Sequence, residues 1–124
     1  MQKVLKNIPA AGLRAYIVWL PMFPGDSRDW ANTRSQEFRD QRLTYFWDSN
    51  RLTGQQWQKV LGISRTAWDV YFLYSADAHW DKEPDAPSFW MHQLNGVESA
   101  RRLDESAFEA KARELLNQIK GQNP

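Results

Sequence analysis

The chain has 124 residues, enough for one domain, and 42% of them are hydrophobic, including seven tryptophans. Its 16 Lys and Arg nearly balance 15 Asp and Glu, which leaves a formal net charge of +1. This balance provides no basic stripe for DNA or RNA and no strong attraction to an anionic membrane surface. The absence of cysteine excludes thiol catalysis, disulfides and thiolate metal sites within these residues.

The longest apolar run, residues 13–23, is interrupted by Arg14 and Pro21. It falls short of the roughly 20 apolar residues that cross a bilayer. The first residues lack the apolar stretch and the cleavage site of a signal peptide. We therefore expect no membrane segment and a cytoplasmic protein by default, with export only if an upstream segment was trimmed away.

The first half of the chain predicts helices and strands in alternation. Residues 3–8 are expected to form the end of a short helix, which Pro9 stops. Residues 13–20 are nearly all apolar and rich in β-branched and aromatic side chains, which is typical of a strand covered on both faces. Ser27 is a good N-cap residue for a helix over residues 28–39.

The middle of the chain continues this alternation. Residues 42–47 favour a second strand, which ends at Asp48. Thr53 and Gln56 have the spacing of a capping box, so a short helix is expected to start there. Gly62 can close that helix in a left-handed conformation.

Residues 68–74 form the clearest predicted strand, because alternate side chains would lie on opposite faces. The residues that follow predict a turn into a short antiparallel strand that reaches Trp80. Residues 81–103 are expected to be irregular. The last helix is capped by Asp104 and stopped by Gly121. Its apolar face consists of Phe108, Ala112, Leu115, Leu116 and Ile119.

The predicted order β-α-β-α-β-β-α indicates one α/β domain with a mixed sheet and helices on its faces. Several stretches in this order resemble the thioredoxin-like superfamily, especially its peroxiredoxin and TlpA-type thiol oxidoreductases. These are residues 13–19, the helix near 28–39, Tyr-Phe-Trp-Asp at 45–48, Gln-Lys-Val-Leu-Gly at 58–62, and residues 69–80. Ala-Trp-Asp-Val-Tyr at 67–71 and Phe-Trp-Met-His-Gln-Leu at 89–94 are similar to segments of poorly characterised bacterial members. The resemblance implies that residues 1–124 are a single thioredoxin-like domain.

Three departures separate the chain from that superfamily. The strand and Cys-x-x-Cys loop expected before the first helix are missing, because the chain starts at Met1. Thr66-Ala67 occupies the position of the family's cis-proline, and Ala78 replaces a hairpin glycine. The first departure removes the family's redox chemistry. Since the missing strand is central in that fold, we expect the sheet to close around the gap, or a second chain or an upstream segment to fill it.

Six residues are candidates for a binding groove: Trp19, Asp48, Trp68, Asp69, Trp90 and His92. The three tryptophans would line an aromatic recess, although aromatic residues at strand spacing also form ordinary core. Asp48 is at the carboxyl end of a strand, where open α/β sheets bind ligands, yet it can equally cap the next helix. Asp69 would either contact a ligand or accept structural hydrogen bonds. His92 would either contact a ligand or anchor the loop that contains it.

Other chemistry has no support in the sequence. His79 and His92 are the only histidines, and without dense ligand spacing we expect no metal or cofactor. No nucleophile elbow or glycine-rich phosphate loop is present, so no catalytic residue is predicted.

Three hypotheses remain. The chain is a non-redox thioredoxin-like module that binds a partner protein or a small ligand through the groove. Alternatively, it is a truncated thiol-disulfide oxidoreductase whose catalytic cysteines lie upstream. In the third hypothesis it is a homo-oligomer whose interface is the surface that the missing strand leaves open, which is compatible with the first.

Overall fold

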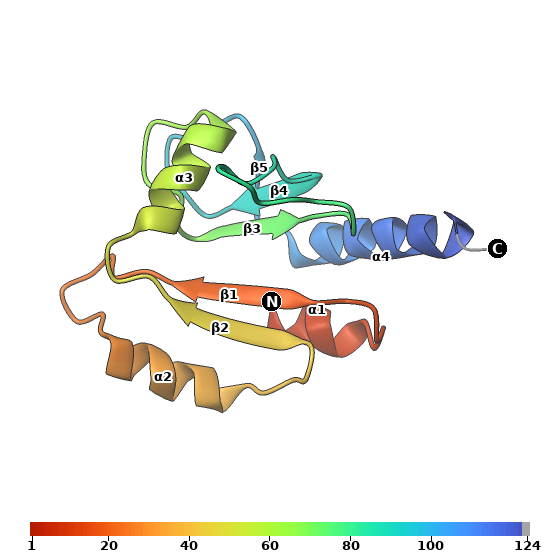
Figure 1. The fold of residues 1–124 in the computed structure, drawn as a ribbon, viewed down its shortest axis with the longest axis horizontal. Coiled ribbons are helices and arrows are strands. Elements are labelled where there is room, and N and C mark those ends of the chain that lie inside the picture. Colours follow the sequence, from red (N-terminus) through yellow and green to blue (C-terminus); the bar gives the residue numbers. More distant parts are fainter. Residues whose placement is uncertain (123–124) are drawn as a thin grey trace.

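The computed structural model describes residues 1–122, which form helices and two small sheets (Figure 1). The elements are α1 (Gln2–Asn7), β1 (Ala15–Trp19), α2 (Arg28–Glu37), β2 (Leu43–Trp47), α3 (Leu52–Leu61), β3 (Val70–Leu73), β4 (Phe89–His92), β5 (Arg101–Arg102) and α4 (Glu105–Gln122). The prediction of an α/β chain is confirmed. The predicted elements are found from β1 to β3 and at the last helix, but β4 and β5 lie in the segment that was expected to be irregular.

The first sheet consists of β1 and β2, two parallel strands joined by the crossover helix α2. The register pairs Trp19 with Trp47 at the carboxyl ends of the two strands. As predicted, Ser27 caps α2, and its hydroxyl oxygen accepts a hydrogen bond of 3.1 Å from the backbone N–H of Trp30. Figure 1 shows α2 next to this sheet, away from α4.

The second sheet corrects two predictions. Its central strand, β4, pairs antiparallel with β3 and parallel with β5, so residues 81–103 are not all irregular. The expected hairpin strand before Trp80 is not formed, and Trp80 makes only an isolated bridge with Pro84. The prolines precede β4 rather than interrupt it, so the aromatic segment Phe-Trp-Met-His at 89–92 is free to pair with β3.

The main hydrophobic core lies between the second sheet and two helices from opposite ends of the chain, α1 and α4. Its buried members are Val4, Ile8, Met91, Phe108 and Ala112. Tyr71 and Leu73 of β3 pack against them from the sheet. The apolar face predicted for α4 therefore points into the core, as its spacing requires.

Arg42 fastens α1 to the start of β2. Its guanidinium bonds the Asp40 carboxylate at 2.7 Å, donates to the main-chain oxygen of Leu5 at 2.8 Å, and also donates to the main-chain oxygen of Ile8. The last carbonyl groups of a helix have no partner within the helix, so this cation satisfies the end of α1. The hydrogen bonds from Arg42 lower the pKa of Asp40 to about 2.

A second apolar cluster lies on the opposite face of β3, against α3. Trp57 of α3 stacks on Phe72 with ring centroids 5.4 Å apart, and it meets Trp80 edge-on at 4.7 Å. The indole N–H of Trp57 donates to the hydroxyl of Tyr74 at 2.8 Å, and that hydroxyl donates to the main-chain oxygen of Asp85 at 2.7 Å. The cluster thus anchors the long connection between β3 and β4.

The single mixed sheet that the sequence predicts is not formed within residues 1–122. β1 pairs only with β2, and β3 pairs only with β4, so residues 13–20 and 68–74 belong to different sheets. Among the described residues, α2 packs against the first sheet, α3 and α4 pack against the second, and no strand joins the two sheets. In Figure 1, β1 and β3 run in opposite directions. In the same described part of the chain, no helix has the length and apolar character needed to cross a membrane.

Candidate functional site

The six residues predicted to form one groove are distributed over both sheets. Trp19 is in β1, Asp48 follows β2, Trp68 and Asp69 precede β3, and Trp90 and His92 are in β4. Four of them have hydrogen-bond partners within the fold, namely Trp19, Asp48, Asp69 and His92. The segment around Trp68 takes part in a different surface.

The aromatic recess expected from three tryptophans is not formed. Trp19 packs under α2, where its indole N–H donates to Ser35 Oγ at 2.9 Å and its ring meets Trp30 edge-on at 5.3 Å. Trp90 belongs to the other sheet. Trp68 is the only one of the three that lies in a loop between elements. The sequence places Trp19 correctly in a strand, but it assigns Trp90 to an irregular segment and does not reveal that the two residues belong to separate sheets.

His92 is fully buried and anchors a loop. Its Nδ1 accepts a hydrogen bond of 3.0 Å from the backbone N–H of Leu94. The proton is therefore on Nε2, which donates to the main-chain oxygen of Ala100 at 3.0 Å. Both ring nitrogens are occupied and the side chain has no exposed surface, so the anchoring role, rather than ligand contact, fits the geometry.

Asp48 caps α3. Its carboxylate accepts from the backbone N–H groups of Leu52 at 3.0 Å and Thr53 at 2.7 Å, and from the Thr53 hydroxyl at 2.6 Å. Burial alone would raise the pKa of Asp48, but these hydrogen bonds outweigh it and lower the pKa. The predicted capping box at Thr53 is therefore wrong: Thr53 is already inside the helix, and Arg51 is the N-cap residue.

Asp69 lies just before β3 and has a left-handed backbone, with φ of 54°. The hydroxyl of Tyr71 donates to its carboxylate at 2.8 Å. The backbone N–H of Gln93 donates to the main-chain oxygen of Asp69 at 3.0 Å, and the Gln93 amide nitrogen, oriented to donate, lies 3.0 Å from the carboxylate. Burial and the hydrogen bond to Asp69 raise the pKa of Tyr71. The carboxylate thus joins the start of β3 to the end of β4.

A different set of residues converges at the carboxyl ends of the parallel strands. Residues 20–27 follow β1, residues 48–51 follow β2, and residues 66–69 lead into β3. We call these three segments together the three-loop surface. Carboxyl ends of parallel strands are the usual location of binding sites in open α/β sheets, because the loops that leave them gather at one edge.

Direct contacts hold these three loops together. The Nε of Arg51 donates to the main-chain oxygen of Pro21 at 2.9 Å, which joins the second loop to the first. The ring of Phe23 meets Trp68 edge-on with centroids 5.3 Å apart, which joins the first loop to the third. Phe23 nevertheless remains 60% exposed. An exposed phenyl ring supported by an indole is the most prominent feature of this surface.

Gly54 of α3 is the point where the loops approach most closely. Its main-chain oxygen accepts a hydrogen bond of 3.0 Å from the backbone N–H of Ala67. A Cβ atom at this position would lie 2.6 Å from Thr66 Cγ2 and 2.8 Å from Leu20 Cδ2. Only glycine therefore allows α3 to contact both loops without displacing them.

The backbone of the three-loop surface is locally strained. Within residues 1–122, Arg51 and Asp69 are the only residues other than glycine with positive φ, at 58° and 54°. Such conformations cost on the order of 1–3 kcal/mol each and occur most often at binding and catalytic sites. Arg51 bonds to Pro21 in the loop that carries Phe23, and Asp69 directly follows Trp68, which the Phe23 ring contacts.

The loop that carries Phe23 has a fixed shape. The carboxylate of Asp26 accepts hydrogen bonds of 2.9 Å from the backbone N–H groups of both Met22 and Phe23. The ring is thus held outward by a side-chain-stabilised turn rather than by a flexible loop. Its position between two prolines was a usable signal in the sequence, whereas the close approach at Gly54 depends on tertiary structure.

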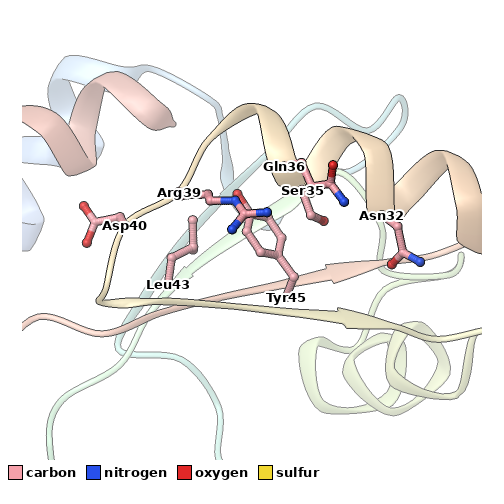
Figure 2. Close-up of a pocket in the computed structure, with 7 residues that line it drawn as sticks. All are labelled: Asn32, Ser35, Gln36, Arg39, Asp40, Leu43 and Tyr45. Atoms are coloured by element: carbon pink, nitrogen blue, oxygen red, sulfur yellow. The ribbon is translucent and has the colours of Figure 1, made fainter.

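A polar hollow of about 460 Å³ lies elsewhere, between α2 and β2 (Figure 2). It is lined by Asn32, Ser35, Gln36, Arg39, Asp40, Leu43 and Tyr45. Two of its polar groups are already engaged, since Asp40 pairs with Arg42 and the hydroxyl of Tyr45 donates to the main-chain oxygen of Phe38 at 2.6 Å. None of the predicted groove residues contributes to this hollow.

Metal and cofactor chemistry gains no support from the described residues. Across residues 1–122, no three His, Cys, Asp or Glu side chains are grouped so that they could hold a metal ion.

Comparisons with protein-family models, curated proteins and solved structures find no match to the chain. The functional argument therefore rests on the geometry of the molecule.

Proposed function

We propose that this chain is a non-redox, thioredoxin-like module that binds a partner protein through the three-loop surface. The observation that carries the proposal is the contact of two of these loops with Gly54, together with the exposed ring of Phe23, which packs against Trp68. Because the sequence contains no cysteine, this surface can offer recognition but not thiol exchange.

The thioredoxin-like part of the proposal rests on the order and direction of the elements. A parallel β1-α2-β2 unit is followed by α3, an antiparallel β3–β4 pair and a final helix. The three-loop surface includes Trp68 and Asp69, two of the six residues that the sequence predicts for a binding groove. A single sheet of this type also requires hydrogen bonds between β1 and β3, and these are not formed within residues 1–122.

A protein partner fits this surface better than a small ligand does. Small-molecule sites are concave and enclose most of the ligand, whereas Phe23 projects from its loop and is 60% exposed. Aromatic rings of this kind are frequent anchors in protein interfaces because they bury a large area with few rotatable bonds. The shaped turn at Asp26 also reduces the entropy lost on binding.

A library of random peptides displayed on phage provides a probe that does not require a known partner. We expect peptides selected on the wild-type protein to lose at least about tenfold in affinity for Phe23→Ser, because an interface anchor contributes more than about 1.4 kcal/mol. Tyr16→Ser is the matched control, since Tyr16 is also an exposed aromatic residue, at 67%, but belongs to β1 and not to the three loops.

Two results would overturn the proposal. One is that no peptide is selected, and the other is that the selected peptides bind Phe23→Ser as tightly as wild type. Circular dichroism of both variants verifies that the fold is intact, which is expected because each side chain is largely exposed.

A further inference from the structure

Within residues 1–122, the β1–β2 sheet has one face without a covering element. Strand alternation places Trp19 and Tyr45 on the face under α2, where they bond to Ser35 and to the main chain of Phe38. Tyr16, Val18, Thr44 and Phe46 form the opposite face, which we call the open face. Tyr16 is 67% exposed and Phe46 is 51% exposed, so this face meets solvent.

The open face is apolar, aromatic and without charge. The rings of Tyr16 and Phe46 lie together, with centroids 6.4 Å apart. No Lys, Arg, Asp or Glu is present among its four residues. Exposed strands are normally protected by charged side chains, and this protection is absent here. Tyr16 and Phe46, two of the exposed large hydrophobic residues, thus lie together on one face of this sheet.

The total exposed area indicates that a large surface remains to be covered. The chain has an accessible surface of 8524 Å² for a mass of 14.6 kDa. A compact monomer of this mass exposes roughly 6,900 Å². The excess of about 1,600 Å² belongs to the chain as a whole, and the exposed rings of Tyr16 and Phe46 contribute to it.

We propose that the open face is the interface between two copies of this chain, stacked sheet against sheet. This inference is independent of the proposed function, because it uses a different surface from Phe23 and Trp68. The absence of charge favours self-association, since any charged residue near the symmetry axis of a dimer would face its own copy.

The register of the two strands makes the open face complementary to itself. Tyr16 is directly opposite Thr44, and Phe46 is directly opposite Val18, so the two large residues lie on one diagonal and the two small residues on the other. A two-fold axis between the stacked sheets, parallel or perpendicular to the strands, therefore places each large side chain over a small one of the other copy. This arrangement is the interdigitation that stacked sheets need at a separation of about 10 Å.

Sedimentation equilibrium of the full chain tests the proposal directly. We expect a species of twice the chain mass of 14.6 kDa that dissociates on dilution. The double variant Tyr16→Lys, Phe46→Lys should raise the dissociation constant at least about 100-fold, because it introduces like charges into the contact. Phe23→Lys is the matched control, since Phe23 is similarly exposed, at 60%, and should leave the dimer intact.

A second measurement locates the contact without disturbing the aromatic rings. Because the chain has no cysteine, Thr44→Cys introduces a single site for a nitroxide spin label. Stacked sheets place the two labels close enough for strong dipolar broadening, whereas labels at Gln118→Cys, on the exposed side of α4, should show none. A monomer at every concentration, a dimer indifferent to the lysine pair, or a dimer without broadening at Thr44→Cys would each overturn the proposal.

Discussion

Replacing Gly54 with alanine adds one methyl group at the point where α3 contacts two loops. The new Cβ would lie 2.6 Å from Thr66 Cγ2 and 3.1 Å from the main-chain oxygen of Ala67. The Leu20 side chain can rotate away, but the main-chain oxygen cannot move without shifting the loop at residues 66–69. The substitution therefore separates elements of the three-loop surface.

Two opposing effects set the size of the change. Overpacking by one methyl group costs about 1–3 kcal/mol, whereas alanine is favoured over glycine within a helix by up to about 1 kcal/mol. We expect Gly54→Ala to lower the free energy of unfolding by about 1–2 kcal/mol. At this chain length, each kcal/mol corresponds to a decrease of roughly 3–6 °C in Tm.

Urea unfolding followed by tryptophan fluorescence is the appropriate assay, because the chain has seven tryptophans. Gly121→Ala provides the control: Gly121 is also in a helix, and a Cβ there meets nothing within 4 Å. This control should be neutral or slightly stabilising. If Gly54→Ala were as stable as Gly121→Ala, the close packing inferred around Gly54 would be wrong.

Three further substitutions test the remaining contacts. Arg42→Ala should free α1, accelerating its amide exchange, and should return the pKa of Asp40 from about 2 towards 3.8 in an NMR titration; an unchanged pKa would contradict the ion pair. His92→Ala should cost about 2–4 kcal/mol in urea unfolding, because it leaves two backbone groups unpaired, and should increase amide exchange in residues 93–100. Asp48→Ala should cost about 1–2 kcal/mol at pH 7 through loss of the cap. Because the folded-state pKa of Asp48 is lowered, its contribution is present above the unfolded value of about 3.9 and is lost as pH falls. The difference between wild type and Asp48→Ala should therefore shrink by pH 2, and a constant difference would refute this reasoning.

Local signals in the sequence predicted individual elements well. The cap at Ser27 is found as expected, and the apolar spacing of α4 places Phe108 and Ala112 in the core. These features depend on neighbouring residues only, so periodicity and capping chemistry are sufficient to identify them. The capping box at Thr53 is wrong, because Thr53 lies inside α3, whereas the alternative role of Asp48 as a cap of this helix is confirmed.

The arrangement of elements was harder to predict, because it depends on contacts between distant residues. The pairing of β3 with residues 89–92 was not predicted, because two prolines and several polar residues before this segment are typical of irregular structure. The same limit applies to the candidate site. The polar character of His92 and Asp69 among apolar neighbours indicated that both need hydrogen-bond partners, but the sequence could not show which groups of the fold supply them.

The proposed dimer also makes a prediction about stability. Nine hydrophobic residues are buried among those that the structure describes, so one copy alone has a small core. If stacking of the open faces stabilises the fold, each tenfold increase in protein concentration should stabilise the dimer by about 1.4 kcal/mol, because unfolding separates the copies.

The urea midpoint of the wild-type protein should therefore rise with concentration. The variant Tyr16→Lys, Phe46→Lys should have a lower midpoint that no longer depends on concentration, whereas Phe23→Lys should retain the dependence. This comparison separates the two surfaces in a single assay, because a lost concentration dependence reports on self-association and not on partner binding. A wild-type midpoint that stays constant over a hundredfold range of concentration would show that the open face does not contribute to stability through a second copy.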